Sequence, residues 1–97
     1  MKYSLHPEAL QDLREAASFY SEKAGAALAQ AVIAEFEHAV DLLLQFPGLG
    51  AAWRHGKRRV LMRRFPYSVI YSVEGDEIRI LAVAHHSRRP GYWRARR

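Results

Sequence analysis

The sequence contains no cysteine, which excludes disulfide bonds and metal sites built on thiolates. It has no run of about 18 uncharged apolar residues, the shortest stretch typical of a membrane-spanning helix. Its first seven residues lack the apolar core of a secretory signal. We therefore expect a cytoplasmic domain without membrane contact.

Signatures of common enzyme classes are missing as well. The chain has no Gly-rich phosphate loop, no nucleophile elbow and no evident pair of catalytic acids. The adjacent His85 and His86 are a combination found in metal sites, but no Asp, Glu or Cys lies at the usual ligand spacing. We expect neither a metal nor another cofactor.

Negative charge is scarce in one half of the chain. Residues 1–50 hold three basic and seven acidic side chains, whereas residues 51–97 hold twelve basic and three acidic ones. Twelve of the fifteen cations are arginine, which suits bidentate contact with phosphate or carboxylate. A solubilising surface intersperses both signs, so this segregation favours a basic working face over a merely solvated one.

Helical periodicity dominates the first half of the 97 residues, a length that fits one domain, residues 1–97. Residues 2–5 resemble a short strand, and Pro7 suits the first turn of a helix. Two apolar stripes at spacings of three and four are separated by Gly25, and Phe46-Pro47-Gly48 ends the second. The stripes are Leu10, Leu13, Ala17 and Tyr20, then Leu28, Val32, Phe36, Val40 and Leu43. They predict an antiparallel helical hairpin.

The period changes to two after a loop over residues 47–57. Strands are predicted at Arg58–Arg64 and at 67–73, and a tight turn at 74–77 leads to a return strand. Ile78, Ile80, Ala82 and Ala84 are expected on one face of that strand. The predicted fold is α+β, in the order β-α-α-β-β-β, with the hairpin packed on a mainly antiparallel sheet whose last two strands are central. Residues 94–97 are expected to fray.

The densest group of reactive side chains follows the last strand, from His85 to Trp93. If the Arg58–Arg64 strand lies close by, Arg63 or Arg64 joins this group. Imidazole, guanidinium and phenol together can cleave RNA through its 2′-hydroxyl, with His as base or acid and Arg stabilising the phosphorane. The same side chains can also simply dock phosphates and bases without chemistry.

Several of these residues have a plain structural interpretation. Tyr92 and Trp93 can pack over the open end of the sheet, which we favour for Trp93. Arg79 can pair with Glu74 or Glu77 at the surface. The three acidic residues early in the first helix are most simply a solvated face; they are Glu8, Asp12 and Glu15.

The order of short motifs along nearly the whole chain resembles the RelE/ParE superfamily of bacterial type II toxins, and more closely its ParE/plasmid-stabilisation branch. The motifs are Pro7-Glu8-Ala9, Arg14-Glu15-Ala16, Phe19-Tyr20, Phe46-Pro47, Arg58-Arg59, Arg64-Phe65-Pro66-Tyr67, Ile70-Tyr71, Ile80 to His85, and Arg88, Pro90, Tyr92 and Trp93. The resemblance implies a growth-arresting toxin bound by an antitoxin whose C-terminal segment wraps it. The positive charge of the second half predicts that this segment is acidic. DNA would then be bound only indirectly, through the antitoxin.

The resemblance leaves two targets open. RelE-like members cut mRNA on the ribosome and ParE-like members inhibit DNA gyrase. A nuclease would use Arg64, His85, Arg88 and Tyr92 without a metal, but the Lys-rich strand of the best-known ribosome-dependent nucleases is missing. Inhibition of gyrase is the leading hypothesis, mRNA cleavage the alternative, and a non-toxic basic nucleic-acid-binding module the third. The predicted target- or antitoxin-binding residues are Arg58, Arg59, Arg63, Arg64, Arg88, Arg89, Tyr92 and Trp93.

Overall fold

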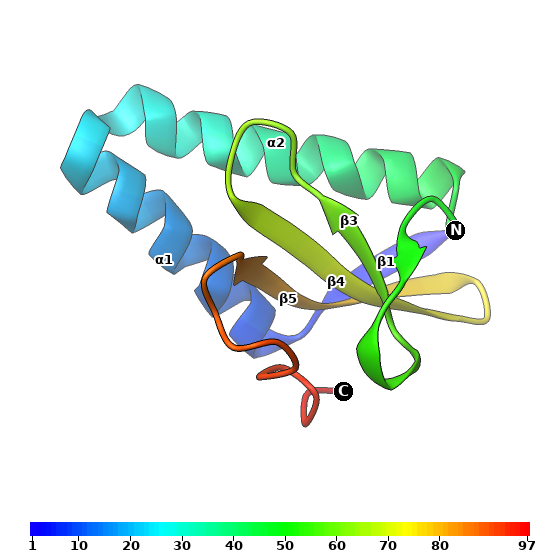
Figure 1. The fold of residues 1–97 in the computed structure, drawn as a ribbon. Coiled ribbons are helices and arrows are strands. Elements are labelled where there is room, and N and C mark those ends of the chain that lie inside the picture. The colour runs from blue at the N-terminus through cyan, green and yellow to red at the C-terminus, as the bar shows by residue number, and fades with distance from the viewer.

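Two helices lie across one face of a five-stranded sheet in the computed structural model, which describes residues 1–97 (Figure 1). The elements are β1 (Lys2–Leu5), α1 (Pro7–Ala24), α2 (Ala26–Gln45), β2 (Ala51–Ala52), a short 3-10 turn (Arg54–Gly56), β3 (Arg58–Leu61), β4 (Tyr67–Glu74) and β5 (Glu77–His85). The predicted α+β class and the order of its elements are confirmed. Neither helix is long and apolar enough to cross a membrane.

The helical hairpin forms where the sequence predicts it. Pro7 opens α1, and the imidazole Nδ1 of His6 caps the helix by accepting the N–H of Glu8 at 3.0 Å. Gly25 separates the helices with φ 97°, a left-handed backbone conformation that favours glycine. Helix α2 ends at Gln45, immediately before Phe46-Pro47.

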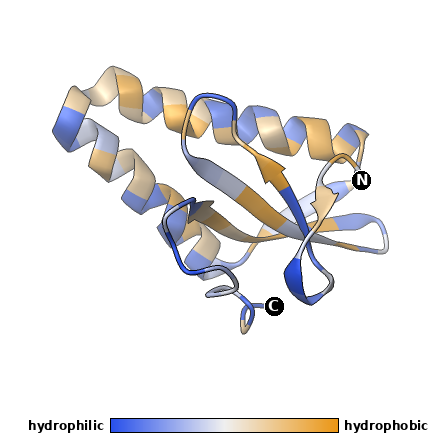
Figure 2. Cartoon of the chain, viewed as in Figure 1, coloured by the Kyte–Doolittle hydropathy of each residue, from blue (hydrophilic) through white to orange (hydrophobic).

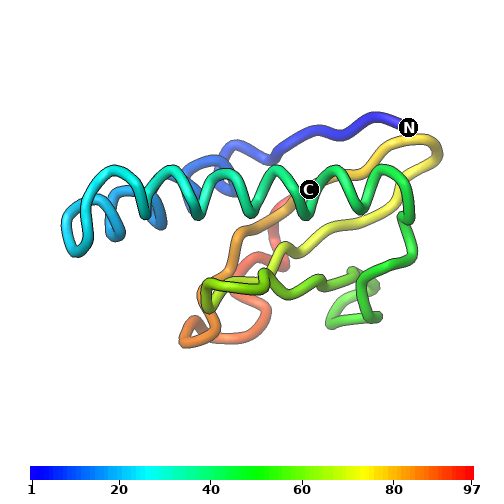
Figure 3. Tube along the Cα trace, turned by 90° about the horizontal axis from the view of Figure 1, so that it is seen from above, coloured from blue at the N-terminus to red at the C-terminus, as the bar shows by residue number.

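The sheet has the strand order β1-β5-β4-β3-β2, with β1 parallel to β5 and the other pairs antiparallel. Figure 3, which looks down on α2, shows β1 and β2 at opposite edges. The prediction that β4 and β5 are central is confirmed. The strand predicted over Arg58–Arg64 is shorter, since it ends at Leu61, and it lies beside β4 rather than β5. Part of the predicted 47–57 loop forms the short edge strand β2.

A bulge in β5 changes which side chains face the helices. Ile70 pairs with Ala82 while Tyr71 pairs with Ile80, so Leu81 is an extra residue without a partner. An inserted residue inverts the alternation that follows it. The expectation that Ala82 and Ala84 share a face with Ile80 is therefore wrong, and Val83 takes their place in the core below the helices.

The main core lies between the hairpin and the sheet. Both helices contribute apolar stripes to it, and Figure 2 shows the alternation of apolar and polar positions along them. The central strands β4 and β5 contribute Val69, Tyr71, Ile78 and Ile80 to this core, and each of these side chains is fully buried. This core supplies the apolar burial that stabilises the domain.

The other face of the sheet is covered by the chain after β5, which we call the C-terminal segment (residues 86–97). Trp93 is 1% exposed and packs on Ile70 and Ala82. The packing role favoured for Trp93 thus matches its position. In Figure 1 this segment, drawn in orange and red, turns back below the sheet and passes close to the first half of α1.

Candidate functional site

Two adjoining hollows lie around the end of β5. The first, the helix-side pocket, holds about 270 Å³ between α1 and the C-terminal segment. The second, the open-face groove, holds about 390 Å³ on the sheet face away from the helices. His85, Arg88 and Tyr92 line both. The structure thus brings together three of the four candidate catalytic residues.

The open-face groove is lined by cations and lacks carboxylates. Arg59 reaches it from β3, and Arg88 and Arg89 reach it from the C-terminal segment. His85 and His86 also line it, whereas no Asp or Glu does. The charged residues of its lining are therefore all positive, which suits an anionic ligand.

Two of these arginines are stacked on aromatic rings. The guanidinium carbon of Arg59 lies 3.7 Å from the ring centre of Trp53, and that of Arg88 lies 3.9 Å from the ring centre of Tyr92. Cation–π stacking restrains a guanidinium group while leaving its edge N–H groups available as donors. The sequence did not point to Trp53 as a support for Arg59, since the two are brought together by the turn at Arg54–Gly56.

The helix-side pocket has mixed charge. Asp12 and Glu15 line it from α1 and face Arg88 of the C-terminal segment. Phe19 adds an aromatic ring that is 50% exposed. An anion entering this pocket would meet carboxylates, so the open-face groove is the better anion site.

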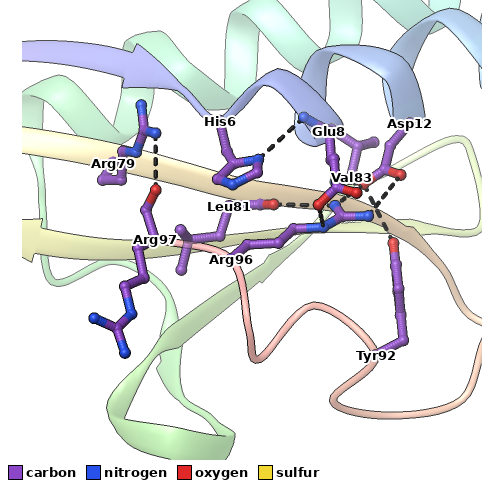
Figure 4. Close-up of polar contacts among 9 residues, drawn as sticks. All are labelled: His6, Glu8, Asp12, Arg79, Leu81, Val83, Tyr92, Arg96 and Arg97. Atoms are coloured by element: carbon purple, nitrogen blue, oxygen red, sulfur yellow. Dashed lines mark hydrogen bonds and ion pairs between the residues drawn. The ribbon is translucent and has the colours of Figure 1, made fainter.

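Asp12 anchors the C-terminal segment rather than facing solvent. Figure 4 shows its carboxylate between α1, β5 and the segment. Oδ2 accepts hydrogen bonds from the Val83 N–H (3.1 Å), the Arg96 Nη1 (2.6 Å) and the Tyr92 hydroxyl (3.3 Å). The expectation of a solvated Asp12 is therefore wrong. The sequence held a signal, because Ala9 and Ala16 of the buried helix face lie three and four residues away.

Arg96 is the second half of this anchor. Its guanidinium also donates to the Leu81 carbonyl at 3.1 Å and pairs with Glu8 at 3.3 Å. The bulge at Leu81 frees that carbonyl from the regular ladder. The Arg96 side chain is only 11% exposed. These contacts do not fit the frayed tail expected at 94–97.

Arg79 also differs from its expected pairing with Glu74 or Glu77. It donates to Ser4 Oγ at 3.1 Å and to the Arg97 carbonyl at 2.8 Å. The reason is the parallel pairing of β1 with β5, which places Ser4 directly opposite Arg79. This contact holds the last residue against the sheet (Figure 4).

The basic residues predicted on the strand after the loop are dispersed. Arg64 lies apart from the groove, where its N–H donates to Glu35 at 2.5 Å and its guanidinium is 4.0 Å from the same carboxylate. Arg63 is exposed and lines neither hollow. Arg58 donates to the Gly50 carbonyl at 2.6 Å and thereby holds the loop before β2. Only Arg59 joins the cluster, because it is paired with Ile70 of the open face, whereas Arg58 is paired with Tyr71 of the helix-side core and β3 ends before Arg63 and Arg64.

Tyr92 is poorly suited to moving protons near neutral pH. Burial, reinforced by the charge of Asp12, raises the pKa of Tyr92 to about 12. Its hydroxyl is already engaged with Asp12. The site can hold anions through its arginines, but it lacks Arg64 and a phenol poised for proton transfer.

The imidazole of His85 is likewise engaged locally. Its Nδ1 accepts the Ser87 N–H at 3.0 Å and lies 2.7 Å from Ser87 Oγ. Its ring also packs edge-on against Tyr67, with the ring centres 5.0 Å apart. These contacts place the ring at the boundary between the two hollows.

Comparison with known proteins identifies a matching family and a similar solved structure. A family model described as the ParE toxin of type II toxin–antitoxin system, parDE, matches residues 3–90. A solved structure described as the chromosomal ParDE TA system from P. aeruginosa is similar, with a TM-score of 0.78 and 26% identity over 88% of this chain and 95% of that chain. No curated protein sequence matches.

Proposed function

This chain belongs to the ParE toxin family of type II toxin–antitoxin systems, and we propose that it arrests bacterial growth by binding DNA gyrase, without a catalytic step of its own. The family match supports this assignment, since ParE-like members are the gyrase-directed branch of the resemblance described above. The protein would act in the cytoplasm.

The proposal that no catalytic step takes place is carried by the state of two of the four candidate catalytic residues, Arg64 and Tyr92. Arg64 contacts Glu35 instead of the groove, and the Tyr92 hydroxyl donates to Asp12. A pKa of about 12 keeps Tyr92 protonated at pH 7 and makes it a weak acid. A surface of fixed arginines without a proton-transfer pair suits a binding inhibitor.

An antitoxin is the expected partner, since the similar solved structure is a ParDE system. An acidic C-terminal segment of that antitoxin would complement the cations of the open-face groove. Charge reversal at Arg88 and Arg89 should then weaken antitoxin binding mainly by slowing association. The same reversal at Arg14, an exposed residue of α1 that does not line the groove, should not. Equal affinities for all these variants would contradict the electrostatic part of the proposal.

The gyrase proposal is tested with purified toxin, gyrase and relaxed plasmid in the absence of ribosomes. We expect inhibited supercoiling and trapped gyrase–DNA cleavage complexes, and induced cells should show DNA damage. Tyr92→Phe should retain inhibition, because the hydroxyl takes no part in chemistry. Unimpaired supercoiling in the presence of folded toxin would overturn the proposal.

The convergence of His85, Arg88 and Tyr92 on one groove keeps mRNA cleavage as the second candidate. It requires codon-phased cuts in translated mRNA that disappear in His85→Ala. Intact mRNA in growth-arrested cells would eliminate it. Unaffected growth at high protein levels would instead favour a non-toxic nucleic-acid-binding module.

A further inference from the structure

The open-face groove has two walls that come from different parts of the chain. Trp53 and Arg59 line it from the side of β3, and Arg88 and Arg89 line it from the C-terminal segment. None of these three arginines takes part in an ion pair of the protein. Like charges repel one another, so the repulsion between the arginines acts to separate the two walls.

His55 connects the two walls, although it lines neither hollow. It belongs to the Arg54–Gly56 turn and therefore lies between Trp53 and Arg59 along the chain. Its ring meets the ring of Trp93 edge-on, with the ring centres 5.9 Å apart. Trp93 is 1% exposed and packs on the sheet, so it gives His55 a fixed support within the C-terminal segment.

The backbone on both sides of this contact is in the left-handed region. His55 has φ 60° and ψ 34°, and it is the only residue other than glycine with a positive φ. Such a conformation costs energy in a residue with a side chain and persists where the surroundings hold it, often at functional sites. Gly91 is buried with φ 82°, and a Cβ built there would lie 3.4 Å from the Nε2 of His55. The absence of a side chain at Gly91 thus lets the imidazole approach the C-terminal segment closely.

We propose that His55 is a positioning residue for the open-face groove: it fixes Arg59 relative to Arg88 and thereby sets the affinity of the groove for the acidic antitoxin segment. The inference rests on the antitoxin contact proposed above. Arg59 is stacked on Trp53, at 3.7 Å from the ring centre, and so moves with that wall. Arg88 is stacked on Tyr92, at 3.9 Å, and moves with the other wall. A groove whose walls are held at one separation is preorganised, so a ligand with carboxylates at the matching spacing binds without the cost of ordering them.

Fluorescence anisotropy with a labelled polyglutamate peptide measures the affinity of the groove in the purified toxin. His55→Asn removes the ring, while asparagine tolerates the left-handed backbone. It should weaken binding about fivefold, a loss in the range found for coupled neighbouring groups. Arg59→Gln should weaken binding in the wild-type background but have little effect in His55→Asn, because Arg59 is then no longer held opposite Arg88. Losses that multiply independently in the double variant would overturn the proposal.

The matched control is His38→Asn, at an exposed position of α2. It should leave the peptide affinity unchanged, and circular dichroism should show all variants folded; an equal loss in the control would overturn the proposal. Hydrogen exchange in the free toxin gives a readout without a ligand, since His55→Asn should raise exchange in residues 53–59 and 88–93 while α1 and α2 remain protected. Unchanged exchange in those residues would show that His55 does not hold the walls. If exchange rises as expected but polyglutamate does not bind even the wild type, the positioning by His55 stands and the proposed antitoxin contact fails.

Discussion

The two faces of the sheet are buried by different means. On the helix side, two amphipathic helices and the sheet bury a cluster of 16 residues. On the open side, only Ile70, Ala82 and Trp93 form a buried cluster, and the C-terminal segment that covers them is tied to α1 through the Asp12–Arg96 pair. One face relies on apolar area and the other on a few directed polar contacts.

This difference separates stability from the working surface. Apolar burial is spread over many residues and tolerates the loss of any single polar contact. The open face depends on one carboxylate, since Asp12 holds Val83, Tyr92 and Arg96 together (Figure 4). Substitutions on the helix side should therefore change stability most. Those at the anchor should act on the C-terminal segment.

The largest effect is expected from Phe36→Ala, in the centre of the helix-side core. Phe36 is 3% exposed, and removing a buried ring costs about 4 kcal/mol of unfolding free energy through lost burial and the cavity left behind. Urea denaturation followed by circular dichroism measures it. Phe46→Ala, at a ring that is 57% exposed, is the control and should cost well under about 1 kcal/mol.

Trp93→Ala should come next, at about 3 kcal/mol, because the open-face cluster has fewer neighbours to lose. Hydrogen exchange should rise in residues 86–97 while α1 and α2 remain protected. Leu61→Ala, at an exposed position of the same face, provides the comparison. If both substitutions cost the same, the open face has no core of its own.

Asp12→Asn should cost about 2 kcal/mol, since it leaves Arg96 with Glu8 as its only carboxylate partner. The coupling between Asp12→Asn and Arg96→Met in a double-mutant cycle should be about 1–2 kcal/mol. Glu15→Gln on the same helix, at an exposed side chain, should be nearly neutral. Additive effects at Asp12 and Arg96 would show that the anchor contributes nothing beyond packing.

The smallest effect at neutral pH is expected from Tyr92→Phe, about 1 kcal/mol for one lost hydrogen bond. The pH dependence is more specific. The pKa of Tyr92 is raised from 10.0 to about 12 in the folded protein, so the unfolded chain loses its proton first. The contribution of Tyr92 to the free energy of unfolding is therefore complete below about pH 10 and is lost as the pH rises towards 12.

Comparing wild type and Tyr92→Phe between pH 9 and 12 isolates this contribution, because Tyr67, whose pKa is also raised by burial, is present in both. The stability difference between the two proteins should shrink over that range. A constant difference would show that the Tyr92 hydroxyl titrates as it does in water.

Local sequence patterns were sufficient to predict the helices and strands and their order along the chain. Pro7, Gly25 and Phe46-Pro47 mark the ends of the hairpin because their effects on the backbone act within a few residues. The alternation in Tyr67–Val73 predicts β4 for the same reason. The grouping of His85, Arg88 and Tyr92 also followed from their closeness in sequence to the end of one strand.

Non-local contacts could not be predicted in this way. Arg59 joins the groove because its register places it opposite Ile70 on the open face, whereas Arg64 lies beyond the end of β3 and contacts Glu35. The bulge at Leu81 reverses the faces of Ala82 and Val83, although nothing in the apolar alternation marks it. Arg96 meets Asp12 across 84 positions of the chain.

The sequence by itself determined the fold class, the helical hairpin, the family resemblance and the segregation of charge, since each depends on composition or on spacing between near neighbours. Only the tertiary structure decided which arginines share a surface, and that Asp12 is an anchor rather than part of a solvated face. The sequence specifies which residues are charged, but whether two charged side chains come into contact depends on strand order and register. These are set by the packing of the whole domain.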